Sequence, residues 1–341
     1  MIIGKAAYLE KINFPLKIED IIIPDPALGQ LLVKVINSSI CGRQIAEISG
    51  AKGKDNFLPH LLGHEGSGIV LKVGNGVKKV KKGDKVVMHW RESKGISSDF
   101  PSYKNKLGKK IGGGLVTTFN QFVLVSENRI TKIPDHTPFD LGALMGCSLS
   151  TALSLVNNEA KLKIGESVMI IGAGGVGLNL ILASKLVSAH PITVGDINYK
   201  KLNLAKKIGA DEIVNLNSFD GLKNKYDVII DTSGNQKAIE FGYNNIKDKK
   251  GRLIMVGQPH YKSKIVFKNA ASNFTGKKII DSQGGKFNPD NDLYNYINLF
   301  LKKKIKYKDI ITHSFKLKDI NKVINKIKSG QITGKCIIEM F

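Results

Sequence analysis

Short apolar or alternating runs recur through the first 145 residues, which is the pattern of β-strands rather than of helices. The runs are rich in Val and Ile, and Gly, Pro and Asn separate them. They are LLVKVINSSI, SGIVLKV, DKVVMHW and NQFVLVS. The polar, glycine-rich stretch from Arg91 to Gly114 lacks this pattern, and we expect it to form a long surface lobe. Residues 1–145 are therefore predicted to form a β-rich domain.

The pattern changes near Asp140, where apolar residues take helical spacing in ALMGCSLSTALSLVNNEA. Beyond it, short buried-type strands alternate with amphipathic helices. The strands are VMII, ITVGD, EIVN, YDVIID and GRLIMVG, and the helices are LNLILASKLV and KKLNLAKKIGA. Such alternation predicts βαβ units and a parallel sheet. Two further helices, LYNYINLFLKKKI and DINKVINKIKSG, and a last strand, KCIIEMF, are expected to follow.

A glycine-rich loop joins the first strand of this second part to its first helix. The strand VMII runs directly into IGAGGVGL, so the GxGxxG spacing stands between a strand and a helix. The first glycine permits the turn, the second lets a pyrophosphate approach the backbone, and the third lets the helix pack closely. The helix N-terminus then faces the phosphates. The predicted cofactor contacts are Gly172, Gly174, Gly175, Val176 and Gly177.

The next strand, ITVGD, ends at Asp196, which lies 19 residues beyond Gly177. A carboxylate at this place accepts hydrogen bonds from both hydroxyls of the adenosine ribose and repels a 2′-phosphate. This favours NAD(H) over NADP(H). Ile197 and Lys201 follow as further expected contacts, and a lysine beside the acid can also bind the ribose, which leaves NADP(H) open.

Three cysteines, Cys41, Cys147 and Cys336, support neither a disulfide framework nor a four-cysteine zinc site. Metal chemistry would therefore recruit histidine or carboxylate. His64 stands beside Glu65, and taken alone such a histidine is more often structural. Together with Cys41 and Cys147, however, its imidazole would give Zn²⁺ three protein ligands and leave a fourth position open. Spacing alone leaves open both interpretations of His64, the structural histidine and the zinc ligand.

The charge balance is strongly positive, with 52 Lys and Arg residues against 29 Asp and Glu, a net charge of +23. Such an excess suits a nucleic-acid or anionic-membrane binder, or simply a lysine-rich surface. Short basic runs recur along the whole chain without a recognition motif, so we favour the lysine-rich surface and expect neither partner. No apolar run approaches the ~20 residues of a membrane span, and nothing resembles a secretory signal. A cytoplasmic location is expected.

Over essentially its whole length the chain resembles the zinc-dependent medium-chain dehydrogenases, the superfamily of alcohol and polyol dehydrogenases. GHEGSGIVLKVGNGV fits the specific pattern G-H-E-x2-G-x5-G-x2-V, and further matching segments are ICG, MGCSLSTAL, IGAGGVGL with GDIN, DTSG, LIMVGQP and GKCIIEM. The resemblance implies an α/β chain with a GroES-like β-barrel catalytic domain (1–145 and 291–341) interrupted by a doubly wound Rossmann domain (146–290). Members pair through their Rossmann sheets, which implies a homodimer or homotetramer.

The resemblance also implies a site. Cys41, His64 and Cys147 would bind one catalytic zinc, with Glu65 beside it or as an exchangeable fourth ligand. Cys147, rather than a carboxylate, is more like the alcohol dehydrogenases than the sorbitol type. Residues expected to line the nicotinamide and ribose pocket are Thr151, Thr232, Ser233 and Val256, and Trp90 is expected to line the substrate pocket.

Two departures from the family pattern matter. The stretch Arg91–Gly114 holds no cysteine, so the second, structural zinc of many members is not expected. Arg43 replaces the hydroxyl residue that usually passes the alcohol proton outward, and Gln44 replaces the usual acid after it. An arginine stays charged and cannot act as such a relay. We hypothesise that Arg43 binds an anion, either the cofactor pyrophosphate or a group on the substrate; a structural salt bridge is the alternative.

The expected activity is reversible hydride transfer between NAD(H) and a small-molecule alcohol or carbonyl, such as a sugar, polyol or other primary or secondary alcohol. A variant of this prediction is a phosphorylated or nucleotide-linked, and hence anionic, substrate. The alternative from another class is a catalytically inactive relative that binds a dinucleotide as a sensor or structural protein.

Overall fold

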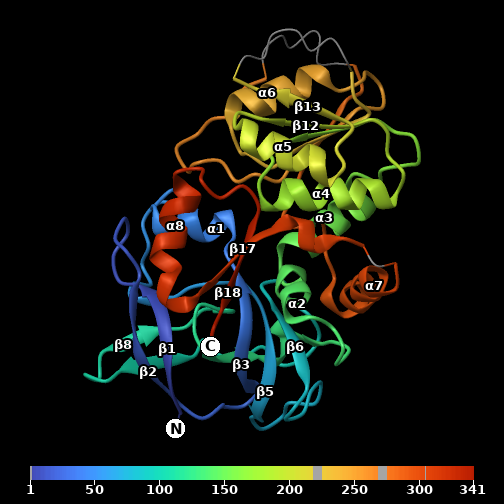
Figure 1. The fold of residues 1–341 in the computed structure, drawn as a ribbon. Coiled ribbons are helices and arrows are strands. Elements are labelled where there is room, and N and C mark those ends of the chain that lie inside the picture. Colours follow the sequence, from blue (N-terminus) through green and yellow to red (C-terminus); the bar gives the residue numbers. More distant parts are fainter. Residues whose placement is uncertain (1, 218–224, 268–274, 304) are drawn as a thin grey trace. The chain divides into compact units, whose positions relative to one another are not determined.

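The computed structural model describes residues 2–217, 225–267, 275–303 and 305–341. The chain divides into two compact units (Figure 1). Unit 1 comprises residues up to 150 together with 288–307 and 311–341, and unit 2 comprises 151–287 and 308–310. Sequence analysis places the corresponding boundaries after residues 145 and 290. In the structure and in the sequence prediction alike, the second unit interrupts the first along the chain.

Unit 1 is built on a closed barrel and a larger sheet. The barrel strands, in spatial order, are β1 (Ile2–Leu9), β2 (Lys17–Ile23), β7 (Ser102–Asn105), β8 (Lys110–Gly112) and β4 (His60–Leu61). The sheet runs β10 (Ile130–Lys132), β6 (Lys85–His89), β5 (Glu65–Val73), β3 (Gln30–Ser39), β18 (Lys335–Glu339) and β17 (Ile311–Lys316), and β9 (Phe122–Ser126) also pairs with β3.

Strand β3 organises unit 1 because both of its faces are buried. Leu31, Val33 and Val35 are fully buried in one core, and Leu32 belongs to a second one. β3 pairs with β18, so the red end of the chain lies beside a blue strand in Figure 1. This pairing puts the last strand in the larger sheet of unit 1. The helices of the unit are α1 (Gly42–Ile48), α2 (Phe139–Met145), α7 (Pro289–Lys302) and α8 (Ile320–Lys328).

The prediction of a surface lobe over Arg91–Gly114 is wrong for part of that stretch. The stretch contains β7 and β8, which pair with each other and close the barrel. Tyr103 and Ile111 on these strands are fully buried. Lysines alternate with them along each strand and point to solvent, so the high lysine content hides a normal strand alternation.

The helical stretch that holds Cys147 breaks in the middle. Helix α2 ends at Met145, and α3 (Ser148–Ser154) begins directly after the cysteine and continues into a π-helical turn, Leu155–Glu159. Gly146 lies at this break. A Cβ there would stand 2.5 Å from the Met88 carbonyl oxygen and 2.9 Å from the Glu65 Cα, so only glycine allows the chain to approach β5 and β6 this closely. The close approach sets Cys147 next to the start of β5.

Unit 2 is a six-stranded parallel sheet with the spatial order β13 (Glu212–Asn215), β12 (Ile192–Asp196), β11 (Val168–Ile171), β14 (Val228–Asp231), β15 (Arg252–Met255) and β16 (Lys278–Asp281). In sequence order this is 3-2-1-4-5-6, the doubly wound arrangement of Rossmann folds. The connecting helices are α4 (Gly175–Leu186), α5 (Tyr199–Ile208) and α6 (Gln236–Asn245). The predicted fold class is confirmed.

Among the described residues, no single helix is both long and apolar enough to cross a membrane. One bent pair, Phe139–Met145 with Ser148–Glu159, reaches that length and apolarity only when its two helices are taken together.

Candidate metal centre and cofactor loop

Cys41, His64 and Cys147 converge in unit 1, with one ligand atom of each residue within 4.8 Å of those of the other two. Cys41 follows β3 and caps the N-terminus of α1, and His64 stands between β4 and β5. The α2–α3 break supplies Cys147. Three segments that are distant in the chain therefore meet at one place.

The chemistry of this donor set fits zinc, since two thiolates and one imidazole are characteristic ligands of Zn²⁺. His64 and Cys147 are each only 9% exposed. The two thiols titrate as a pair: a hydrogen bond from Cys147 lowers the pKa of Cys41, and the same contact raises the pKa of Cys147. A bound divalent cation would take the place of the shared proton, with both sulfurs as thiolates.

Gln44 supports two members of the cluster from the first turn of α1. Its amide nitrogen contacts His64 Nδ1, and its oxygen accepts a hydrogen bond from the Cys41 backbone N–H at 3.2 Å. The side chain is 2% exposed. An amide offers one acceptor and one set of donors, whereas the acid usual in the family offers two acceptors. Gln44 therefore contacts both neighbours, but only its oxygen accepts, and the atom that faces His64 is its amide nitrogen.

Arg43 lies next to this cluster in sequence but is exposed to solvent. Its guanidinium has no ion pair or hydrogen bond with any residue that the structure describes. Burial lowers the pKa of Lys52, and the Arg43 charge adds to that effect, so these two cations influence each other. The predicted pocket residue Trp90 is half-buried, and its carbonyl oxygen accepts a hydrogen bond from Arg129 at 2.6 Å.

In unit 2 the three glycines of the GxGxxG loop differ in their surroundings. Gly172 has φ +96°, the left-handed region that favours glycine, so it forms the turn. A Cβ at Gly177 would stand 1.9 Å from the Gly172 carbonyl oxygen, so only glycine lets α4 approach the loop. A Cβ at Gly174 would meet no described atom within 4 Å. The backbone before Gly175 and Val176, the first residues of α4, is thus open to a ligand.

Asp196 ends β12, and its carboxylate faces the glycine loop. One oxygen accepts from the Ala173 backbone N–H at 2.7 Å, and the other accepts from the Asn198 backbone N–H at 2.9 Å. Each oxygen keeps a second lone pair for a further donor. Ile197 is exposed, and Lys201 donates its backbone N–H to the side chain of Asn198, the N-cap of α5.

Thr232, Ser233 and Val256 cluster around the carboxyl ends of β14 and β15. The Thr232 hydroxyl donates to the carbonyl oxygens of the strand–loop junction, Ile171 and Gly172, both at 3.0 Å. Asp231 accepts from the Ser233 hydroxyl at 2.6 Å, and its carbonyl oxygen accepts from the Val256 N–H at 2.9 Å. Sequence reasoning missed this role of Asp231. Thr151, the other predicted pocket residue, is buried in α3.

Two family descriptions match the chain. "Alcohol dehydrogenase GroES-like domain" matches residues 27–135, and "Zinc-binding dehydrogenase" matches residues 175–302. The chain belongs to the zinc-dependent medium-chain dehydrogenase superfamily.

Individual members of the superfamily match over nearly the full length. Alcohol dehydrogenase 2 of Zea mays is 28% identical, and the alignment covers 98% of this chain and 97% of that protein. The structure of benzyl alcohol dehydrogenase from Acinetobacter calcoaceticus superposes with a TM-score of 0.89 at 22% identity and covers 100% of both chains. Acetophenone reductase from Geotrichum candidum, in complex with NAD, gives 0.82 at 20% identity over 99% of this chain and 98% of that one. These structural likenesses show the shared fold.

In this medium-chain dehydrogenase both oxygens of the Glu65 carboxylate have partners within the protein. One oxygen pairs with Lys335 Nζ at 2.5 Å, and the other accepts from the Ser148 backbone N–H at 3.1 Å. Lys335 also donates to the Ile40 carbonyl oxygen at 3.2 Å. Glu65 is fully buried, and Lys335 is 3% exposed. Sequence analysis missed Lys335, and the only signal was a lysine that opens an otherwise apolar strand.

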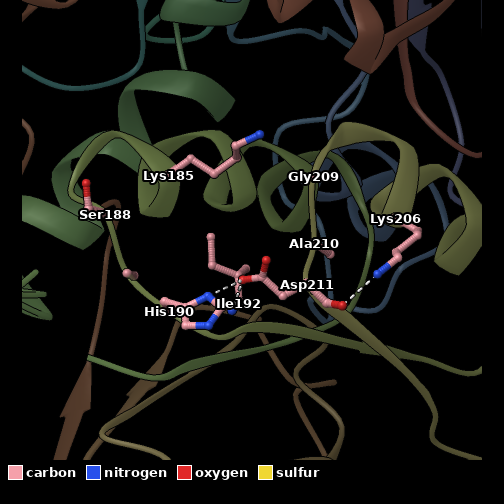
Figure 2. Close-up of a pocket in the computed structure, with 9 residues that line it drawn as sticks. Lys185, Ser188, His190, Ile192, Lys206, Gly209, Ala210 and Asp211 are labelled. Atoms are coloured by element: carbon pink, nitrogen blue, oxygen red, sulfur yellow. Dashed lines mark hydrogen bonds and ion pairs between the residues drawn. The ribbon is translucent and has the colours of Figure 1, made fainter. Parts of the chain in front are cut away.

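Unit 2 also has a cavity of about 460 Å³, drawn in Figure 2. Its lining residues are Lys185, Ser188, Ala189, His190, Ile192, Lys206, Gly209, Ala210 and Asp211. It lies at the amino end of β12, whereas the glycine loop follows the carboxyl end of the parallel strand β11. The C-termini of two helices and Asp211 meet there, and their negative charge disfavours the binding of a phosphate. We therefore do not place the cofactor site in this cavity.

Proposed function

We propose that this chain is a zinc-dependent oxidoreductase that transfers a hydride between an alcohol and NAD(H). The observation that carries the proposal is the convergence of Cys41, His64 and Cys147 in unit 1. Unit 2 independently supplies a dinucleotide-type loop. The relative from Zea mays is named an alcohol dehydrogenase, and none of the comparisons favours the catalytically inactive alternative.

Each group of residues has a definite task in this proposal. Cys41, His64 and Cys147 hold the metal, and Gln44 orients the imidazole. The backbone between Gly174 and Gly177 and the N-terminus of α4 bind the pyrophosphate. When bound, zinc supplies Lewis acidity toward an alcohol or carbonyl oxygen, and the nicotinamide accepts or donates the hydride. The predicted roles of Thr151, Thr232, Ser233, Val256 and Trp90 remain part of the proposal.

The preference for NAD(H) rests on Asp196. Its carboxylate is fixed by two backbone N–H groups, so it cannot easily turn away from an incoming 2′-phosphate. We expect a panel of alcohols, polyols and sugar phosphates, followed by nicotinamide absorbance, to show turnover with NAD at a kcat/KM at least about tenfold above that with NADP. Turnover with NADP alone would contradict the cofactor assignment. Absence of turnover from zinc-loaded protein across the whole panel would contradict the function.

Arg43 is proposed to bind an anion, because it is an exposed cation beside a predicted metal ligand and has no partner among the described residues. We expect Arg43→Ser to raise KM for an anionic substrate or for the cofactor by roughly tenfold or more, the magnitude of a lost charge-assisted hydrogen bond. Steady-state kinetics measures both constants. Lys104→Ser, which removes an exposed cation from β7, is the matched control. Unchanged KM values for cofactor and substrate in Arg43→Ser would remove the hypothesis.

Assembly and location complete the proposal. A homodimer or homotetramer is expected from the family resemblance, and light scattering after size exclusion measures the mass. We expect one zinc per chain, bound at the cysteine cluster, and no structural zinc in residues 91–114. A cytoplasmic location accords with three free cysteines, and cell fractionation tests it.

A further inference from the structure

We propose that Glu47, Asp55 and His60 form a second divalent-cation site in unit 1. One ligand atom of each residue lies within 4.8 Å of those of the other two. None of the three belongs to the cysteine cluster, and the proposed oxidoreductase function assigns no role to any of them. The inference therefore stands independently of that function.

His60 is held in the orientation that a metal ligand needs. Its side chain is 10% exposed, and Nδ1 lies 2.8 Å from the Leu61 carbonyl oxygen. A carbonyl only accepts, so Nδ1 carries the hydrogen and donates it. Metal-binding histidines are typically fixed in this way through the nitrogen that does not bind the metal. The ring therefore directs Nε2 at the Asp55 carboxylate, 2.8 Å away.

Asp55 and Glu47 reach the same place from two different segments. Asp55 precedes β4, and its Oδ1 accepts from the Phe57 backbone N–H at 2.9 Å, which turns Oδ2 toward His60. Glu47 comes from the last turn of α1, one turn beyond Gln44. The Asp55 side chain is 13% exposed and that of Glu47 is 28% exposed. The site is thus enclosed on the His60 side and open to water at Glu47.

With Nδ1 protonated, Nε2 shares either a proton or a metal ion with Asp55. A metal that enters displaces that proton and then holds a neutral imidazole and two carboxylates. This donor set suits Zn²⁺, Co²⁺ or Mn²⁺ and completes its coordination with water. Bonds of about 2.1 Å put tetrahedral ligand atoms roughly 3.4 Å apart. Binding therefore requires His60 Nε2 and Asp55 Oδ2, now 2.8 Å apart, to separate slightly, and the partial exposure of Glu47 leaves its side chain room to adjust.

Lys52 is the competing cation at this site. Its ammonium lies 3.7 Å from Glu47 Oε2, with 32% of the side chain exposed. Without a metal, the Lys52 ammonium and the His60 imidazole are the partners of the two carboxylates. If the cluster is a plain ion-pair network, removal of Lys52 leaves an excess of negative charge and nothing more. If it is a metal site, the same change strengthens binding.

A bound ion would tie α1 to the segment that leads into β4. Helix α1 starts at Cys41 and carries Gln44, which contacts His64. The second ion would therefore brace the helix that orients two ligands of the first. The ligands of this second ion would be two carboxylates and one imidazole. They would not be cysteines of residues 91–114, since that stretch has none.

Cobalt titration separates the two sites, since only the cysteine cluster gives intense thiolate-to-cobalt charge-transfer absorption. We expect the protein to bind about two Co²⁺ per chain, of which one adds only weak visible bands. His60→Gln and Glu47→Gln should each lose the weak-band ion, or weaken it by at least about tenfold, and keep the charge-transfer bands. Lys52→Met should tighten that ion by roughly tenfold.

Controls keep the result specific to this cluster. Asp25→Asn removes an exposed carboxylate that pairs with Lys72, and it should bind both ions. Cys147→Ala should lose the charge-transfer ion and keep the second one, so failure of the proposed function and failure of this proposal give different results. A wild-type protein that binds only the charge-transfer ion overturns the inference. So does retention of the weak-band ion, with unchanged affinity, in both Glu47→Gln and His60→Gln.

Discussion

Cys147→Ala is expected to abolish turnover, with kcat lower by about a thousandfold or more, because the zinc that supplies the Lewis acid loses one of three protein ligands. Cys147 is 9% exposed, and its sulfur lies within 4.8 Å of the ligand atoms of the other two residues, so the alanine removes a donor that faces the cluster. Dinucleotide binding should persist, since the glycine loop belongs to unit 2. Turnover, zinc content and quenching of NADH fluorescence measure the three quantities.

Cys336→Ala is the matched control for that experiment. Cys336 is also a buried cysteine, 2% exposed in β18, and burial raises the pKa of its thiol to about 11. A neutral thiol in an apolar core is not a metal ligand, so the Cys336→Ala variant should keep its zinc and its turnover. Near-native activity in Cys147→Ala, or equal zinc loss in both variants, would refute the zinc assignment.

The fold and the main site were accessible from the sequence for identifiable reasons. Strands buried on both faces, such as VMII, read as continuous apolar runs, and the glycine loop between a strand and a helix has a single physical use. The metal ligands were different. The residue types alone suggested Cys41, His64 and Cys147 as a set but left a structural role for His64 open, and the resemblance carried by the segment around His64 favoured the metal site.

What the sequence could not supply depends on side chains that meet far from their chain neighbours. Lys335 looked like a polar residue at a strand edge, and its partner Glu65 lies 270 positions away. The second cluster joins a helix to a loop, and neither segment has metal-ligand spacing. β8 was hidden because two lysines precede the buried Ile111 and glycines follow it. In each case tertiary packing decides the role, and local pattern does not.

Lys335→Met should reduce the free energy of unfolding by about 3–5 kcal/mol, because it leaves the fully buried Glu65 charge without its partner. Burial alone would lower the pKa of Lys335, but the charges of Glu65 and of the cysteine sulfurs outweigh it and raise the pKa overall. Lys335 is thus held charged beside Glu65. Glu65→Gln in the Lys335→Met background should recover part of the loss, since no unpaired charge remains. Guanidinium unfolding of the zinc-loaded wild type and of both variants measures these differences.

An exposed pair nearby gives the scale for this loss. Lys316 and Glu339 lie 2.8 Å apart with side chains 49% and 43% exposed, and water already solvates both charges. Lys316→Met should therefore cost less than about 1 kcal/mol. Equal losses in Lys316→Met and Lys335→Met would show that the buried pair is not charged as described. A Lys335→Met protein has a further consequence: Glu65 loses the cation that pairs with one of its two carboxylate oxygens. Tighter zinc binding in that variant would indicate that Glu65 can serve as the exchangeable fourth ligand, and that Lys335 decides when it does.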